Sequence, residues 1–453
     1  MVSIGYRGLI RARRGLLRSL PMTSVHTDAR RVPPKWLQEV LQDNTEPPRL
    51  YAWTPANLHG PSIGTSHVNT AASLEHNNDA ERRRIYILGI GNLGRLFATG
   101  LAKSTSRSPI TLVVHRRDLL ERWVADPGIE MTKLGRKERL TDFDIEYWTD
   151  QKPAFGPARE PAFGRQISNL LVATKAQDSM TQVDMLRRYL DSASTVAFIQ
   201  NGMCKLWPPL GSAYVKARFL RNPGPNWIVC VTTHGVTSLG PFRSLHASPA
   251  DVLVGSVTTS ERDASEAGYL LKQLIDAPGL NSRPVSTREL WISQVEKLVV
   301  NSTINPLTAI LRCKNGELII ERGDSLPRIL DRLIHEASEV LRALVLDPSI
   351  ESILRDDSSE SLDVTRAELL RRFSGVRLRE MFYTVAAKVA ENRSSMLQDV
   401  DAGKKTEIRE FNGWLVDTAN YLDIKSPVST HKKLITLVED NVKLERHELD
   451  NHF

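Results

Sequence analysis

Cysteine is scarce in this sequence. The 453 residues contain three cysteines, Cys204, Cys230 and Cys313, which are widely separated and odd in number. Disulfide frameworks and clustered zinc sites need several cysteines at close spacing, so the sequence predicts neither a disulfide scaffold nor a metal site. Reduced, structural cysteines are typical of a reducing compartment, and we expect that environment for this chain.

Long apolar runs are missing as well. No uninterrupted apolar stretch approaches the ~20 residues that a membrane-spanning helix needs, so no membrane span is predicted. Aromatic residues make up 6% of the chain, while hydrophobic residues together make up 41% and charged residues 25%. This balance is ordinary for a globular protein. The chain length suggests about two or three domains.

The excess of positive charge is confined to the first part of the chain. The formal net charge is +7, and residues 1–40 hold eight Lys and Arg against Asp28 and Glu39, a local charge of +6 that leaves +1 for the rest. Because the basic charge is not spread over the chain, nucleic-acid binding is disfavoured. Residues 1–27 contain five arginines and no acid, a composition typical of a mitochondrial transit peptide. We expect a transit leader over 1–40 and a mitochondrial location; a non-targeting basic leader and a cytoplasmic location are the alternatives.

The periodicity of apolar residues divides the remaining chain into three parts. Residues 41–82 are rich in Pro, Asn, His, Thr and Ser without periodicity, and we expect a disordered linker there. Residues 83–285 alternate short apolar strands with helical patterns, which favours a parallel sheet covered by helices on both faces. Residues 286–453 show only helical patterns, which predict an all-helical domain. Two polar stretches, 135–165 and 347–362, are expected to be surface insertions.

The expected elements can be placed individually. Strands are predicted over 85–88, 110–114, 170–173, 195–199, 228–232 and 252–257. A helix is predicted over 180–190, and in the last part of the chain helices are predicted over 288–312, 325–346, 363–397 and 404–423.

A glycine-rich turn follows the first strand and opens a helix. It consists of Gly89, Ile90, Gly91, Asn92, Leu93 and Gly94. The first glycine allows a tight turn, the second allows the backbone to approach a pyrophosphate, and the third allows close packing of helix and strand. The free N–H groups at the helix N-terminus favour an anion. This context predicts dinucleotide binding; a turn with only a packing role is the alternative.

The residues after the second strand indicate which dinucleotide is bound. NAD sites usually have an acidic residue at this place, whereas this chain has Arg116 and Arg117 after His115. A guanidinium group can hold a 2′-phosphate by two hydrogen bonds, so NADP(H) is favoured over NAD(H). Asp118 is either the missing acid or, as we expect, the N-cap of the next helix.

A polar stripe lies along the first helix of the last part of the chain. Lys297, Asn301 and Asn305 are spaced i, i+4 and i+8, which places them on one helix face. A lysine and two amides aligned in this way offer a cation, donors and acceptors to a small oxygen-rich ligand. The alternative is a lysine that extends from a packed helix beside two satisfied amides.

Seven blocks of the sequence, in order, resemble the ketopantoate reductase (2-dehydropantoate 2-reductase) family over roughly residues 84–440. The blocks are GIGNLG at 89–94, TKAQD at 174–178, QNGM at 200–203, TTHGV at 232–236, EKLVVNSTINPLTA at 296–309, NRSSMLQD at 392–399 and KTEIREFNG at 405–413. The resemblance implies an α/β fold: a Rossmann-type domain, then a helical domain like that of 6-phosphogluconate dehydrogenase, with the active site between them. It also implies NADPH-dependent reduction of 2-dehydropantoate to (R)-pantoate, in pantothenate and coenzyme A biosynthesis.

The resemblance also implies roles for individual residues. Lys297 is implied as the general acid, and Glu407 as its carboxylate partner. Lys175 and Asn201 match cofactor contacts of the family, while His234 is open between a site role and a structural one. The residues that match substrate-binding positions are Asn301, Asn305, Asn392 and Ser395.

Other functions stay open at this point. A related 2-keto acid reductase of shifted specificity needs only a few changed contacts. A non-catalytic NADP(H)-binding regulatory protein is a further alternative, although Lys297 and Glu407 are both present. The expected partner is a small-molecule 2-keto acid, and a homodimer is one option for the assembly.

Overall fold

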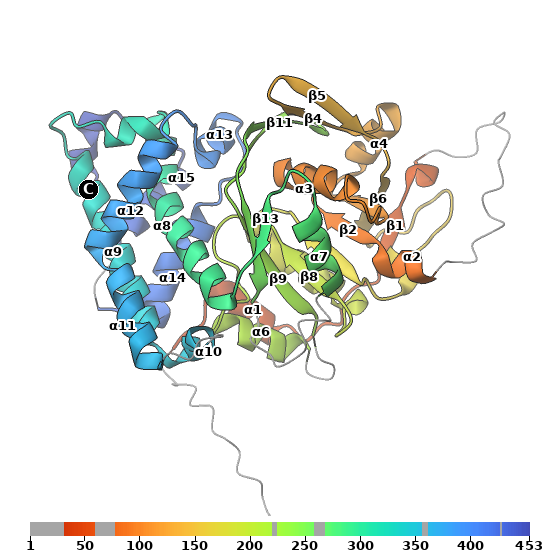
Figure 1. Cartoon of the computed structure of the whole chain (residues 1–453), viewed down its shortest axis with the longest axis horizontal. Coiled ribbons are helices and arrows are strands. Elements are labelled where there is room, and N and C mark those ends of the chain that lie inside the picture. Colours follow the sequence, from red (N-terminus) through yellow and green to blue (C-terminus); the bar gives the residue numbers. More distant parts are fainter. Residues whose placement is uncertain (1–30, 59–77, 220–223, 258–267, 356–360, 426–427) are drawn as a thin grey trace, which may run out of the picture.

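The computed structural model describes residues 31–58, 78–219, 224–257, 268–355, 361–425 and 428–453. The predicted leader falls largely on residues 1–30, which lie outside the described residues. Figure 1 shows a half that contains the sheets and a half made of helices, joined where helix α8 (Thr287–Leu311) follows strand β13 (Ser282–Pro284). In the described residues, no helix has the length and apolar character that crossing a membrane requires.

Within the described residues, nine strands form one large sheet in the order β1-β6-β3-β2-β7-β8-β9-β12-β13. Besides β13, the strands are β1 (Tyr51–Trp53), β2 (Ile85–Leu88), β3 (Ile110–Val114), β6 (Asp144–Thr149), β7 (Asn169–Val172), β8 (Thr195–Phe198), β9 (Asn226–Thr232) and β12 (Val252–Ser256). The run from β6 to β9 is parallel throughout. When these six strands are numbered by their position in the sequence, they lie side by side in the order 3-2-1-4-5-6. This is the arrangement of dinucleotide-binding sheets.

Both faces of this sheet are buried. Ile85 and Ile87 of β2 belong to one hydrophobic core, while Tyr86 and Leu88 of the same strand belong to a second. Burial on both faces explains why the parallel strands, apart from β6, are predominantly apolar in the sequence. Helices α3 (Asn92–Ala102), α4 (Arg117–Ala125) and α7 (Gly268–Asp276) pack in the first core. Helices α1 (Lys35–Gln42), α5 (Ala176–Leu186) and α6 (Leu210–Arg218) pack in the second.

The prediction of a disordered linker over 41–82 is wrong for its first part. Strand β1 pairs with β6 and extends the large sheet. Helix α1, which overlaps the end of the predicted leader, is anchored by Leu37, and the chain between them by Leu50; both side chains are buried. Strand β1 has only three residues, too few to show a periodicity. The apolar residues of α1 recur at helical spacing, but most of this helix was assigned to the leader. Further on, α2 (Asn78–Arg83) directly precedes β2.

The prediction that 135–165 is a surface insertion is also wrong in part, because this stretch supplies β6 of the large sheet. It also supplies β5 (Arg136–Leu140) of a small sheet with the order β10-β11-β4-β5. The other strands of the small sheet are β4 (Ile129–Lys133), β10 (Gly235–Gly240) and β11 (Arg243–Ser248). Strand β5 lies at the edge of its sheet and is almost entirely exposed, which is why its sequence, RKERL, is polar.

The helical half contains α8, α9 (Leu326–Leu346), α10 (Glu351–Leu354), α11 (Leu362–Arg372), α12 (Gly375–Lys388), α13 (Ser395–Asp401), α14 (Trp414–Tyr421) and α15 (Ser429–Glu439). The single helix predicted over 363–397 is divided into α11, α12 and the start of α13. The prediction that 347–362 is a surface insertion is wrong in part, because Ile350 and Ile353 of this stretch are buried in the core. That core is continuous with one face of the large sheet, so the two halves pack directly against each other.

The long helix α8 contains a proline that would leave a carbonyl group unpaired. Pro306 has no N–H group and cannot bond to the carbonyl oxygen of Ser302, four residues earlier. The buried side chain of Asn412 donates to that oxygen at 2.9 Å and also lies 2.9 Å from Nδ1 of His431. Residues from the last part of the chain therefore hold the segment of α8 that carries the polar stripe.

Candidate active site

The predicted site residues of the sheet-containing half gather along the carboxyl edge of the parallel strands. Gly89 follows β2, Arg116 follows β3, Lys175 follows β7 and Asn201 follows β8. Thr232 is the last residue of β9. In sheets with this strand order, dinucleotides bind at this edge.

The glycine turn has the geometry that a dinucleotide needs. Gly89 has φ of +95°, which favours glycine. A Cβ atom on Gly94 would lie 2.2 Å from the carbonyl oxygen of Gly89, whereas a Cβ atom on Gly91 would meet no heavy atom within 4 Å. The turn is thus closed on its protein side and open at Gly91, in front of the N-terminus of α3, where a pyrophosphate can approach the backbone.

The small sheet fixes this turn through Asn92, which was predicted as part of the turn, and through Arg95, which sequence reasoning missed. The Asn92 side chain donates to the carbonyl oxygen of Val236 in β10 at 3.1 Å. Arg95 is buried and donates to the carbonyl oxygens of Ile90 at 3.1 Å and Gly240 at 2.9 Å. Burial lowers the pKa of Arg95 to about 10. The signal in the sequence was weak, because the strands of the small sheet were not predicted.

Of the two arginines after β3, the structure leaves Arg116 at the edge of the sheet. Its side chain is exposed and forms an ion pair with Asp118, with Nε 3.1 Å from Oδ1. The guanidinium group of Arg117 instead lies over the ring of Trp53, at 5.5 Å from the centroid. Arg116 is the N-cap residue of α4, so Asp118 is not the N-cap that we predicted but a first-turn acid.

Lys297 of α8 reaches across to the sheet-containing half. Its Nζ atom donates to Oδ1 of Asn201 at 3.0 Å and to the carbonyl oxygen of Thr232 at 2.5 Å. Burial lowers the pKa of Lys297 to about 8, and the negative charge of Glu407 partly opposes this shift. A lysine with this pKa can release a proton near neutral pH. Thr232 belongs to the block TTHGV but was not predicted as a site residue.

Glu407 is a buried residue of the helical half. Its Oε1 atom accepts a hydrogen bond of 3.0 Å from the backbone N–H of Ala176, in the first turn of α5. Its Oε2 atom lies 4.0 Å from Nζ of Lys175. Burial raises the pKa of Glu407, while Lys175 and the Ala176 N–H group lower it. Glu407 therefore acts on Lys297 as a nearby charge, and its hydrogen bond goes to α5.

Lys175 links the two halves of the molecule. Its Nζ atom lies 2.6 Å from Oδ2 of Asp399 in α13, and the carboxylate is largely buried. Asp399 ends the block NRSSMLQD, but the sequence alone could not show that its partner lies more than 200 residues away, with a separation of 224.

The four residues expected to bind substrate are brought together only in part. Asn301 and Asn305 lie on α8 beyond Lys297, as predicted. The Asn305 side chain donates to Oγ of Ser395 at 3.4 Å, which joins α8 to the start of α13. Asn392 is exposed, and its described hydrogen bonds are those of its backbone.

His234 has a structural role in the described residues. Its Nδ1 atom lies 2.9 Å from Nε2 of His246, and its Nε2 atom lies 2.9 Å from the carbonyl oxygen of Leu280. Desolvation lowers the pKa of both histidines, that of His246 to about 4. This buried pair joins the small sheet to the chain before β13.

A dinucleotide-binding sheet whose strand ends meet a lysine and a carboxylate from a helical domain defines a nucleotide-dependent oxidoreductase. Comparison with known families assigns the particular type. Residues 85–259 match the family described as ketopantoate reductase PanE/ApbA, and residues 290–440 match the ketopantoate reductase PanE/ApbA C-terminal domain. The chain belongs to the ketopantoate reductase family, and its glycine turn is a binding site for NAD(P)H. The predicted resemblance and fold class are confirmed.

Curated relatives differ in the activity for which they are named. The chain is 40% identical to ketoisovalerate reductase BEA2 of Gibberella fujikuroi, over 92% of this chain and 98% of the relative. It is 38% identical to ketoisovalerate reductase of Beauveria bassiana, again over 92% of this chain and 98% of the relative. It is 28% identical to the probable 2-dehydropantoate 2-reductase of Schizosaccharomyces pombe, over 78% of this chain and 95% of the relative.

Solved structures share the fold at lower identity. The probable 2-dehydropantoate 2-reductase of Bacillus subtilis superposes with a TM-score of 0.52 at 21% identity, over 79% of this chain and 99% of the other. A D-mandelate dehydrogenase solved with NADH and anilino(oxo)acetate superposes with a TM-score of 0.56 at 17% identity, over 79% and 97%.

Proposed function

We propose that this protein reduces 2-ketoisovalerate, or a closely similar branched-chain 2-keto acid, to the 2-hydroxy acid with NADPH. The observation that carries this proposal is the 40% identity, over nearly the whole chain, to a relative named ketoisovalerate reductase. Identity to the S. pombe protein named for 2-dehydropantoate is 28% over a smaller share of the chain. The comparisons therefore favour the alternative of shifted specificity over our first expectation, reduction of 2-dehydropantoate.

The two substrates are a matched pair. 2-Dehydropantoate carries a hydroxymethyl group at C3 where 2-ketoisovalerate carries hydrogen, and the keto and carboxylate groups are the same. A site that binds the extra hydroxyl group leaves polar atoms unpaired when that group is missing, whereas an apolar site discriminates less strongly. Specificity is thus set by the few side chains that face C3.

The chemistry needs a hydride and a proton at the same carbonyl group. When bound, NADPH supplies the hydride to C2 of the keto acid. Lys297, protonated below its pKa of about 8, gives a proton to the C2 oxygen and becomes neutral. The Asn201 side chain and the Thr232 carbonyl oxygen orient its Nζ atom. The negative charge of Glu407 raises the pKa of Lys297 and therefore favours its protonated form.

The remaining site residues are proposed to orient the substrate. Asn301 and Asn305 lie one and two turns beyond Lys297 on the same face of α8. Their amide groups, with the hydroxyl group of Ser395 beside Asn305, can donate hydrogen bonds to the keto acid carboxylate. Arg116 is proposed to hold the 2′-phosphate of NADPH, because its guanidinium group is exposed at the carboxyl end of β3.

The test is NADPH oxidation by the purified protein with each of the two keto acids. We expect kcat/KM for 2-ketoisovalerate to exceed that for 2-dehydropantoate by ~10-fold or more, the range that one group in a binding pocket produces. Pyruvate serves as the control for a site that accepts any 2-keto acid. A preference for 2-dehydropantoate would overturn the proposed specificity but not the reductase activity. No NADPH oxidation with any of the three would overturn both.

A further inference from the structure

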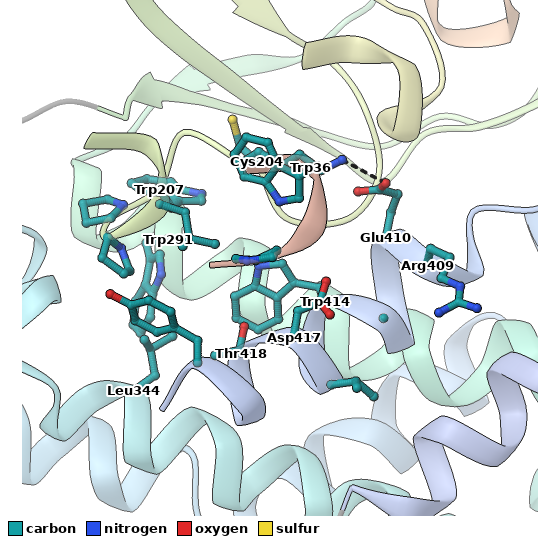
Figure 2. A pocket seen from close by; sticks show the side chains of 18 of the residues that line it. Trp36, Cys204, Trp207, Trp291, Leu344, Arg409, Glu410, Trp414, Asp417 and Thr418 are labelled. Carbon is teal, nitrogen blue, oxygen red and sulfur yellow. Dashed lines mark hydrogen bonds and ion pairs between the residues drawn. The ribbon is translucent and has the colours of Figure 1, made fainter. Parts of the chain in front are cut away.

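A cavity lies away from the candidate active site, between α1, the loop after β8 and α14. Its volume is about 220 Å³. Figure 2 shows side chains of the N-terminal segment, the 204–210 segment and the helical half around it. No predicted cofactor, substrate or catalytic residue lines this cavity, so the proposed reaction does not use it.

Several large aromatic rings line the cavity. The chain has eight tryptophans, and four of them line this one space together with a tyrosine: Trp36, Trp207, Trp291, Trp414 and Tyr421. They come from α1, the loop after β8, α8 and α14. Trp207 is held by its indole N–H group, which donates to Gln294 at 2.5 Å. Trp291 is held by an edge contact with Phe373.

Two internal cations already use rings of this wall. Nζ of Lys205 lies 5.5 Å from the centroid of Trp36 and 3.1 Å from Oε1 of Glu410. The guanidinium group of Arg31 lies 5.2 Å from the centroid of Tyr421 and also pairs with Asp347. A cation over an aromatic face with a carboxylate beside it is therefore the arrangement that this part of the molecule stabilises.

The cavity also offers an aromatic ring and a carboxylate that pair with no cation among the described residues. Trp414 and Asp417 are spaced i, i+3 on α14, so they lie on one helix face, and Figure 2 shows both at the cavity. Within the part of the chain that the structure describes, Asp417 forms neither an ion pair nor a hydrogen bond. The nearby cations are engaged elsewhere: Arg409 binds Glu439 through two contacts of 2.6 Å, and Lys205 binds Glu410.

We propose that this cavity binds a small organic ammonium ion, with its charged group between the Trp414 ring and the Asp417 carboxylate. Alkylated ammonium groups suit such a site, because their charge is attracted by the ring face and their methyl groups are desolvated at low cost. The exposed carboxylate of Asp417 marks the mouth of the cavity. This proposal is independent of the proposed reductase activity.

Choline and 3,3-dimethylbutan-1-ol are matched probes, since they have the same shape and differ in the positive charge. Calorimetric titration of the full-length protein should show saturable binding of choline, and ~10-fold or weaker binding of the neutral alcohol. Asp417→Asn, a nearly isosteric change at an exposed position, should weaken choline binding by several-fold and leave the alcohol unaffected. Asp440→Asn, at the end of α15 and outside the cavity, is the control and should change neither.

A second variant tests the contribution of the Trp414 ring to binding separately from that of the carboxylate. Trp414→Phe keeps an aromatic side chain but weakens the attraction for a cation, so choline binding should fall while circular dichroism stays unchanged. Equal affinity for choline and the alcohol would overturn the proposal. Undiminished choline binding in Asp417→Asn, or no saturable choline binding by the wild-type protein, would do so as well.

Discussion

At the scale of the residue, Lys297 owes its proposed role to its surroundings. An exposed lysine keeps its proton far above neutral pH and is a weak acid. Burial lowers the pKa of Lys297 to about 8, and two oxygen acceptors fix the position of Nζ. The general acid must be protonated, so activity should be retained below this pKa and lost above it.

The pH dependence of kcat/KM tests this electrostatic arrangement. We expect kcat/KM to fall as the pH rises through about 8, the pKa of Lys297. Glu407→Gln removes a charge that raises this pKa, so the fall should move to lower pH. Glu296→Gln is the control, because Glu296 is next to Lys297 in sequence but binds Arg372 at 2.6 Å. Identical pH profiles for wild type and Glu407→Gln would contradict this account.

Cofactor choice is a second prediction at this scale. Arg116→Asp should weaken NADPH binding by ~10-fold or more, as expected for loss of charge-assisted hydrogen bonds, with little effect on NADH. Fluorescence titration with both cofactors measures this. Arg122→Asp, an exposed position on the same helix, should change neither affinity. Equal losses for NADPH and NADH in Arg116→Asp would exclude a 2′-phosphate contact.

Single residues could be predicted where few residue types can occupy the position. The glycines of the turn were found because only glycine fits φ of +95° at Gly89 or the contact at Gly94. The stripe on α8 was found because helical spacing is visible in the sequence. Thr232 contributes only a carbonyl oxygen, which any residue could offer, and its side chain therefore gave no signal.

At the scale of the element, prediction succeeded where an element is buried on both faces. The parallel strands from β2 to β9, apart from β6, are predominantly apolar and were placed nearly correctly. Strands β1 and β5 were missed, since β1 has three residues and β5 is exposed. Helix α15 was missed as well, although its buried residues recur at helical spacing.

The packing of α1 and β1 against the rest of the protein leads to a stability prediction. The reference for this test is a protein that lacks residues 1–30, and a second deletion, of residues 1–57, also removes α1 and β1. The second deletion loses burial of Leu37, Leu50 and Trp53, roughly 1.5–3 kcal/mol for each side chain. Differential scanning fluorimetry should therefore show a melting temperature several degrees lower for the longer deletion. Equal melting temperatures would mean that β1 adds nothing to the sheet.

At the scale of the whole molecule, the site exists because two domains meet. Lys297, Glu407 and Asp399 come from the helical domain, and their partners Thr232, Ala176 and Lys175 come from the other. Neither set is complete alone. The resemblance to a known family located this junction, but sequence spacing could not pair residues so far apart. The link from Lys175 to Asp399 is the main feature that only the structure supplied.

The location of the protein in the cell is a further property of the whole molecule. We propose that residues 1–30 direct the protein to mitochondria, on the basis of five arginines without an acid in the first 27 residues. A fluorescent reporter fused to residues 1–45 should colocalise with mitochondria, and replacing the five arginines by glutamine should abolish this. A diffuse signal from the unmodified fusion would contradict the proposal.

The central claim is that Lys297 supplies the proton for reduction at the junction of the two domains. The most direct measurement is NADPH oxidation by Lys297→Met with 2-ketoisovalerate, together with NADPH binding by fluorescence. We predict that kcat falls by ~10²-fold or more, the low end for loss of a general acid. NADPH should still bind with wild-type affinity, because the glycine turn at Gly89–Gly94 lies on the other domain. Wild-type turnover in Lys297→Met would contradict the claim.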